Sequence, residues 1–269
     1  MTQSVAASSI FCMTVSCLVG FGIPISLLIF FHKKKKADIP PFLVGCVVML
    51  LFAMILEASV HQIVLSSSAG EVIKNNIWLY ALYGGLMAGL FEETGRFVAF
   101  KTVLKKSQDK DVNALMYGAG HGGFEALMLL GLGMINNILY SVMINSGSIS
   151  LLTASLPEEA KAQMQSVIDS LVSSPSYLFL IGSAERIFVV ILQISLSVLV
   201  FFAAKNKEKW YLFPVSIFLH FFVDAVTALL SGKGISVLWI EIAVGILSLL
   251  TALCAMLVWK KNHISEGGL

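Results

Sequence analysis

Two motifs within apolar stretches of this sequence place an imidazole and a carboxylate four positions apart, His121 with Glu125 and His220 with Asp224. Residues four apart share one face of a helix, with Cβ atoms about 5–6 Å apart. Two helices that each present such a pair could surround one divalent ion, because zinc accepts imidazole nitrogens and carboxylate oxygens. The sequence therefore indicates a site for Zn²⁺ or another divalent metal, held by both histidines and one or both carboxylates.

A third motif, Glu92-Glu93-Thr94-Gly95-Arg96, supplies groups that could accept a proton. A glutamate near a metal-bound water can take a proton from it. Adjacent helix residues point about 100° apart, so only one of the two glutamates is expected to face the ion. The other is expected to pair with Arg96, three or four residues further along the helix. We predict that one glutamate is the general base, and on sequence alone it can be either.

The elements that carry these motifs are predicted to be membrane-spanning helices. The chain has 269 residues, of which 57% are hydrophobic and 13% are charged. Soluble domains carry about 25% charged residues, so this composition argues against a soluble fold. A spanning helix needs roughly 20 apolar residues. Seven stretches are long enough, at about 8–31, 41–66, 76–103, 112–140, 176–204, 211–230 and 235–259. We predict an all-α integral membrane protein, a bundle of about seven transmembrane helices forming one domain over residues 1–269.

The lysines predict how this bundle is oriented. Thirteen of them follow the first, third, fifth and seventh stretches, and three lie on the opposite side. Because lysine accumulates on the cytosolic side, the N-terminus is expected outside and the C-terminus in the cytosol. The loop 141–175 is then extracytoplasmic. Its segment Ser155-Leu156-Pro157-Glu158 is typical of a helix start with a capping box, and it predicts a short interfacial helix.

Charged groups inside the stretches indicate function, because each costs about 2.5–3.5 kcal/mol at the centre of a membrane. At about 1.5 Å per residue, one group of six falls roughly 14–20 Å below the cytosolic surface. This inner layer consists of Glu92, Glu93, His121, Glu125, His220 and Asp224. Glu57, His61, Glu185 and Arg186 map to the outer half instead. There we expect a structural contact between Arg186 and Glu57.

The order of these motifs resembles that of the YhfC-type intramembrane metalloproteases. The matching segments are E-E-T-G-R at 92–96, G-H-G-G-F-E at 120–125 and H-F-F-V-D at 220–224, with A-E-R at 184–186. Relatives of that family include PrsW proteases, type II CAAX endopeptidases and the anterior-pharynx-defective scaffold subunit of γ-secretase. The resemblance implies a catalytic base in the glutamate pair. It also implies that the later histidines and carboxylates bind metal or polarise the scissile carbonyl. CAAX enzymes have one more residue between the glutamates and the arginine.

The sequence as a whole predicts a metal-dependent intramembrane peptidase in a bacterial cell membrane. Its partners would be the lipid bilayer and membrane-embedded peptides or proteins, cut near the cytosolic side. A net charge of +2 gives no sign of nucleic-acid binding. One alternative is a proton- or cation-coupled transporter. Paired broken helices are typical of transporters, and the one interrupted stretch, at 20–24, has no clear partner. The other alternative is a non-catalytic scaffold or immunity-type protein, which metal analysis would distinguish from the peptidase.

Overall fold

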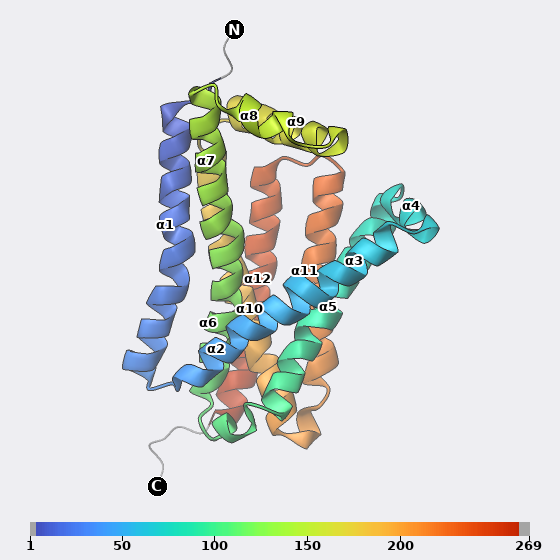
Figure 1. The fold of residues 1–269 in the computed structure, drawn as a ribbon. Coiled ribbons are helices and arrows are strands. Elements are labelled where there is room, and N and C mark those ends of the chain that lie inside the picture. Colours follow the sequence, from blue (N-terminus) through green and yellow to red (C-terminus); the bar gives the residue numbers. More distant parts are fainter. Residues whose placement is uncertain (1–3, 264–269) are drawn as a thin grey trace. The chain divides into compact units, whose positions relative to one another are not determined.

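The computed structural model describes residues 4–263, and this part of the chain consists of helices joined by short turns, with no strand (Figure 1). In chain order the α-helices are α1 (Ala7–Ile29), α2 (Ile39–Val48), α3 (Ala58–Leu65), α4 (Ser68–Lys74), α5 (Ile77–Lys101), α6 (Val112–Ala126), α7 (Gly133–Asn145), α8 (Ile149–Ala154), α9 (Glu158–Ser173), α10 (Leu178–Lys205), α11 (Leu212–Gly232) and α12 (Val237–Asn262). The prediction of an all-α membrane protein is confirmed.

Six helical segments of the described chain are long and apolar enough to cross a membrane. They are Ala7–Lys34, Ile39–Leu65, Val112–Asn145, Leu178–Lys205, Lys207–Gly232 and Val237–Asn262. The remaining predicted span, the third at about 76–103, corresponds to α5, which has 25 residues and therefore the length for a crossing. Two glutamates and an arginine make α5 more polar than the six segments named above. Which side of the membrane each terminus occupies stays a prediction.

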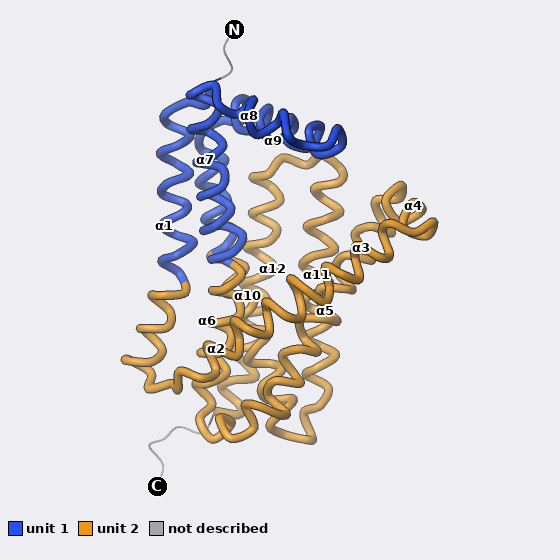
Figure 2. Tube along the Cα trace, viewed as in Figure 1, with its two compact units in different colours: residues 1–23, 126–186 blue, residues 24–125, 187–269 orange. Residues whose placement is uncertain are grey.

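The described helices group into two compact units (Figure 2). Unit 1 comprises residues 1–23 and 126–186, and unit 2 comprises residues 24–125 and 187–269. All of the inner-layer residues predicted from sequence belong to unit 2. That the whole chain forms one domain stays a prediction.

In unit 1, the predicted helix of the 141–175 loop is α9. Its apolar face packs as expected, with Ile168 and Leu171 buried against Val5 and Met13. The predicted capping box is wrong in one respect, because Pro157 and not Ser155 is the residue that precedes the first helical turn. The Ser155 hydroxyl donates to the Leu152 carbonyl instead, since a separate short helix, α8, ends beside it.

In unit 2, α5 and α11 lie side by side along much of their length (Figure 1). Glycine makes this approach possible at two positions on α5. A Cβ atom on Gly85 would lie 2.6 Å from the Phe221 carbonyl oxygen, and one on Gly89 would lie 2.7 Å from that of Ile217. Small residues four apart allow such close helix packing in membranes. The resulting contact brings the glutamates of α5 next to the histidine of α11.

Most of the part of α10 that belongs to unit 2 is buried, and residues 195–204 are buried on every side. Leu192, Leu196, Leu199, Phe201 and Phe202 are each at most 2% exposed. A helix that is apolar all round is stable in the interior of a bundle. This helix therefore forms the centre of the unit, and any polar side chain it carries faces other helices.

Two segments of unit 2 wind as π-helices, which the sequence did not indicate. They are Phe30–Lys34, after α1, and Met49–Glu57, between α2 and α3. Short π-helical turns within α-helices often occur at functional sites. The second of them ends at Glu57, and the continuous helix from α2 to α3 runs obliquely past α5 (Figure 1).

Candidate functional site

The candidate site of unit 2 is built on two histidine–glutamate pairs, each joining α5 to another helix. In the first pair, His121 Nε2 on α6 lies 2.8 Å from Glu92 Oε2. In the second, His220 Nδ1 on α11 lies 2.8 Å from Glu93 Oε1. All four residues are buried. A ring nitrogen that faces a carboxylate at this distance carries the hydrogen, so each imidazole donates to its glutamate.

The second pair extends toward the surface of the unit through Asp224. His220 Nε2 lies 3.5 Å from Asp224 Oδ2, one turn further along α11. The predicted sharing of one helix face is thus confirmed for these two residues. The Asp224 side chain is 38% exposed, whereas that of His220 is 3% exposed. Asp224 therefore lies at the border between the dry network and the outside.

Arg96 lies between the two pairs and contacts both glutamates. Its guanidinium is fully buried, with Nη1 3.4 Å from Glu93 Oε1 and Nη2 4.0 Å from Glu92 Oε2. The expected pairing of Arg96 with a glutamate of its own motif is confirmed for Glu93, and the guanidinium also lies within ion-pair distance of Glu92. Residues three and four apart lie on the same side of a helix, so one arginine can reach both carboxylates. The closer contact is with Glu93, whose side chain is completely buried, while that of Glu92 keeps 8% of its surface exposed.

Gln193 on α10 connects the remaining groups, and the sequence reasoning missed it. Its Oε1 accepts from Arg96 Nη2 at 2.5 Å, and its Nε2 donates to Glu92 Oε2 at 3.0 Å and to Glu125 Oε2 at 3.1 Å. The amide is almost completely buried. Counting residues from the cytosolic end of each stretch would have found it if uncharged polar residues had been included. Gln193 interrupts an apolar run of α10 at the depth predicted for the inner layer.

The structure therefore joins every member of the predicted inner layer in one hydrogen-bonded and ion-paired network. The contacts run from His121 to Glu92, through Gln193 to Glu125, and through Arg96 and Glu93 to His220 and Asp224. The proximity that the depth count predicted is confirmed. Which of these residues bind metal and which are catalytic stays a prediction.

The donor atoms of the network fit a divalent metal in kind, since imidazole nitrogen and carboxylate oxygen are zinc ligands. Two buried atoms of the network that could bind a metal, His121 Nδ1 and Glu93 Oε2, have no hydrogen-bond partner. Among residues 4–263, however, no three histidine, cysteine or acidic side chains lie together closely enough to hold an ion. Metal binding thus requires candidate ligand side chains of the network to move closer together.

The predicted outer layer is not separate from this network in unit 2. Glu57 interacts electrostatically with Glu92, His220 and Asp224, and its Oε1 lies 3.1 Å from His61 Nε2. The helix that contains α2 and α3 runs obliquely past α5 and brings Glu57 near this network (Figure 1). The depth of Glu57 in the membrane stays a prediction.

The other two outer-layer residues belong to unit 1, where Arg186 pairs with its neighbour Glu185. The expected contact between Arg186 and Glu57 would join the two units and stays a prediction.

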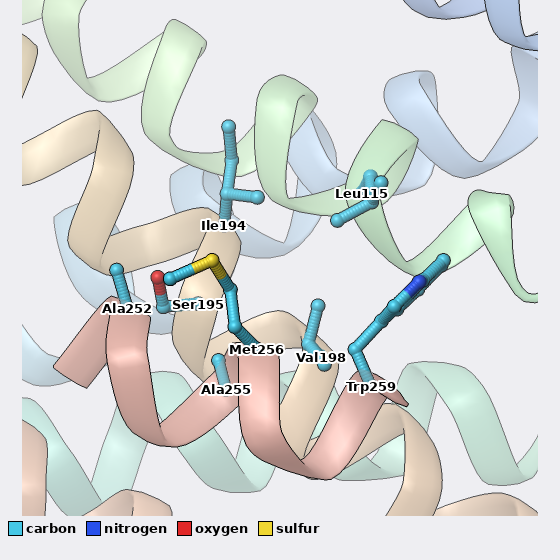
Figure 3. Close-up of a pocket in the computed structure, with 8 residues that line it drawn as sticks. All are labelled: Leu115, Ile194, Ser195, Val198, Ala252, Ala255, Met256 and Trp259. Carbon is cyan, nitrogen blue, oxygen red and sulfur yellow. The ribbon is translucent and has the colours of Figure 1, made fainter. Parts of the chain in front are cut away.

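Unit 2 also contains a cavity whose lining differs from that of the candidate site. It measures about 230 Å³ and lies between α6, α10 and α12, lined mainly by apolar side chains such as Leu115, Val198 and Met256 (Figure 3). The Ser195 hydroxyl in its wall already donates to the Ile191 carbonyl. This cavity offers no group for acid–base or metal chemistry.

Apolar helices that enclose a buried histidine–carboxylate network define a multi-pass membrane protein with an enzyme-like interior. The chain belongs to the YhfC intramembrane metalloprotease family, whose model matches residues 17–245. A similar relative is the uncharacterized membrane protein YhfC of Bacillus subtilis strain 168. It is 35% identical over 233 residues, which cover 86% of this chain and 88% of the relative. No solved structure matches the chain. Family and fold together place the protein in the bacterial cell membrane.

Proposed function

We propose that this protein is a metal-dependent intramembrane peptidase that cleaves membrane-associated peptides or proteins near the cytosolic side. The observation that carries the proposal is the buried network of unit 2, in which two histidines from different helices each contact one of two adjacent glutamates. The name of the family supports the same reaction class. The cytosolic position follows from the distribution of lysines along the chain.

Glu92 is the better candidate for the general base. It interacts electrostatically with both His121 and His220, and part of its side chain remains exposed. Hydrogen bonds from His121 and Gln193 stabilise its ionised form, which is the form that accepts a proton. Glu93 is sealed from solvent beside Arg96, so we assign it to holding the arginine and orienting His220.

His121, His220, Glu125 and Asp224 would hold the metal, most simply Zn²⁺. When bound, such an ion polarises a carbonyl and makes a nearby water more acidic. Gln193 keeps Glu125 and Glu92 at a fixed separation by donating to both. Arg96 offsets part of the negative charge of the site. The surrounding apolar helices exclude bulk water, which strengthens every electrostatic interaction within.

A non-catalytic scaffold is the second candidate, and one observation favours it. Each imidazole already has a carboxylate partner at 2.8 Å, and such a network could simply hold α5, α6 and α11 together. In that case the network would bind no metal and its glutamates would be equivalent in function.

Identification of new peptide ends tests the proposal. Purified protein would be reconstituted with solubilised bacterial membranes, and the termini produced would be identified by mass spectrometry. We expect new termini within or beside spanning segments with the wild type, and none with E92Q or after removal of divalent metal. Glu71, which is exposed on α4, provides the matched control E71Q, which should cleave like the wild type. Identical termini with wild type, E92Q and E71Q would contradict the proposal.

A further inference from the structure

A cavity with both apolar and polar side chains in its wall lies beside the candidate site. It lies within unit 2 between α3, α5 and α11 and measures about 280 Å³. The residues of its wall that matter here are His61, Tyr80, Tyr83, Gly84, Gly85 and Asp224. Ligand pockets usually begin at about 300 Å³, so this cavity has room for one large side chain and not for a whole ligand of drug size.

One wall of the cavity is a hydrogen-bonded chain that links α3 to α5. His61 Nε2 lies 3.1 Å from Glu57 Oε1, and His61 Nδ1 lies 3.0 Å from the Tyr83 hydroxyl. The imidazole also packs edge-on against the Tyr83 ring. These contacts fix a tyrosine ring and an imidazole at the cavity wall, with a buried carboxylate directly behind them.

Another residue of the wall, Asp224, belongs to the candidate site. Asp224 borders the cavity and lies 3.5 Å from His220, which in turn contacts Glu93. A group bound in the cavity would therefore lie one side chain away from the proposed catalytic network. This is where a substrate residue next to the scissile bond would be expected.

The charges around the cavity favour a cation. The carboxylates of the connected region belong to Glu57, Glu92, Glu93, Glu125 and Asp224, and its one guanidinium belongs to Arg96. With neutral imidazoles, a bound divalent ion would still leave an excess of negative charge. The tyrosine rings of the wall add faces that attract cations.

We propose that this cavity is a subsite that binds a basic side chain, lysine or arginine, of a membrane-associated polypeptide. That the polypeptide is a substrate rests on the proposed peptidase function. The size of the cavity, the surrounding negative charge and the tyrosine rings all suit such a side chain. Its long apolar stem would pack along Leu65 and Ala228, and its charged head would lie near Asp224. The subsite would place the residue that follows or precedes the cleaved bond.

Gly84 provides a way to fill the cavity without disturbing the fold. A Cβ atom added there meets nothing within 4 Å, whereas one on neighbouring Gly85 would collide with the backbone of α11. Gly22 on α1 is a matched control, since a Cβ atom there also meets nothing within 4 Å. Both G84L and G22L are therefore expected to fold.

The experiment measures binding to protein in lipid nanodiscs by energy transfer from labelled protein to a labelled peptide. The probe is a spanning peptide of about 20 leucine and alanine residues with one lysine near one end. The comparison peptide has norleucine in place of the lysine. We expect the wild type and G22L to bind the lysine peptide about tenfold more tightly than the norleucine peptide. G84L should lose this preference, and E57Q should reduce it.

Equal affinity of the wild type for both peptides would overturn the proposal, and so would an undiminished lysine preference in G84L. The binding measurement does not depend on cleavage, so the two proposals can fail separately. A lysine preference that disappears in G84L, in a protein that generates no new termini, would support the subsite and contradict the peptidase. New termini without any lysine preference would contradict the subsite alone.

Discussion

Two polar clusters of unit 2 differ in burial more than in chemistry. In the network of the candidate site, Arg96 lies 3.4 Å from Glu93, and both side chains are completely buried. Where α2 and α6 begin, Lys110 lies only 2.7 Å from Asp38, but these side chains are 37% and 39% exposed. Breaking the shorter ion pair is expected to cost less, because water screens it and hydrates either partner that is left alone. Burial, and not distance, determines how much each cluster contributes to stability and to chemistry.

The largest expected effect is the loss of bound metal on substitution of a network histidine. We predict that purified protein contains about one divalent ion, most simply zinc, and that H121A and H220A lose it. His32, whose Nδ1 lies 3.0 Å from the Ala37 carbonyl oxygen near the exposed cluster, provides the control H32A. Elemental analysis of protein prepared without chelators is the measurement. Equal metal content in all four proteins would show that the network is not a metal site.

Removing the arginine of the network should destabilise the protein far more than removing the lysine of the exposed cluster. R96M leaves Glu92 and Glu93 without their shared cation in a dry interior, and we expect a loss of about 3–5 kcal/mol. K110M should cost at most about 1 kcal/mol, since its partner remains hydrated. Thermal or denaturant unfolding in detergent measures both. Similar losses for the two variants would contradict the role assigned to burial.

The Gln193 amide should have an intermediate effect. Q193L leaves Arg96 with one partner fewer and removes a donor from both Glu92 and Glu125, so we expect a loss of about 1–3 kcal/mol. Gln62, which is exposed on α3, gives the control Q62L, with an expected change below about 0.5 kcal/mol. A Q193L variant as stable as Q62L would show that the amide does not hold the carboxylates in place.

The smallest expected effect is a pH dependence from the exposed cluster. A hydrogen bond from Lys110, and then one from Asn113, hold the pKa of Asp38 below its ordinary value. The contribution of Asp38 to stability is therefore fully present above the ordinary aspartate pKa of about 3.9 and is lost as the pH falls through the lower folded value. Unfolding measured against pH should show this loss in the wild type and not in D38N. Parallel curves for the two proteins would contradict it.

Much of the fold could be predicted from the sequence because the length of an apolar stretch is a local signal. The stretch expected at 76–103 became α5 (Ile77–Lys101), and the one at 235–259 became α12 (Val237–Asn262). The π-helical turn at Met49–Glu57 could not be predicted, since its residues are as apolar as those of the helices on either side. Because neither that turn nor the oblique course of α3 could be predicted, the sequence did not indicate that Glu57 lies near the candidate site.

The sequence predicted most of the residues that belong to the candidate site, but it did not predict most of the contacts between them. Charge in an apolar stretch is costly, so Glu92, His121 and His220 are conspicuous in the sequence. Gln193 carries no charge and was overlooked, although it contacts both Glu92 and Glu125. Arg96 pairs with Glu93, and its second contact, with Glu92, was not predicted. Pairing of this kind depends on side-chain rotation and on neighbouring helices, which spacing along one helix does not determine.

The most direct test of the central claim measures metal content and cleavage in the same preparations of E92Q and E93Q. If Glu92 is the general base, E92Q keeps its metal and its fold but generates no new termini from membrane polypeptides. E93Q should keep measurable cleavage and unfold more readily, because Arg96 loses its closer partner. Full cleavage by E92Q, or equal and small effects of both substitutions, would contradict the assignment of a peptidase site to this network.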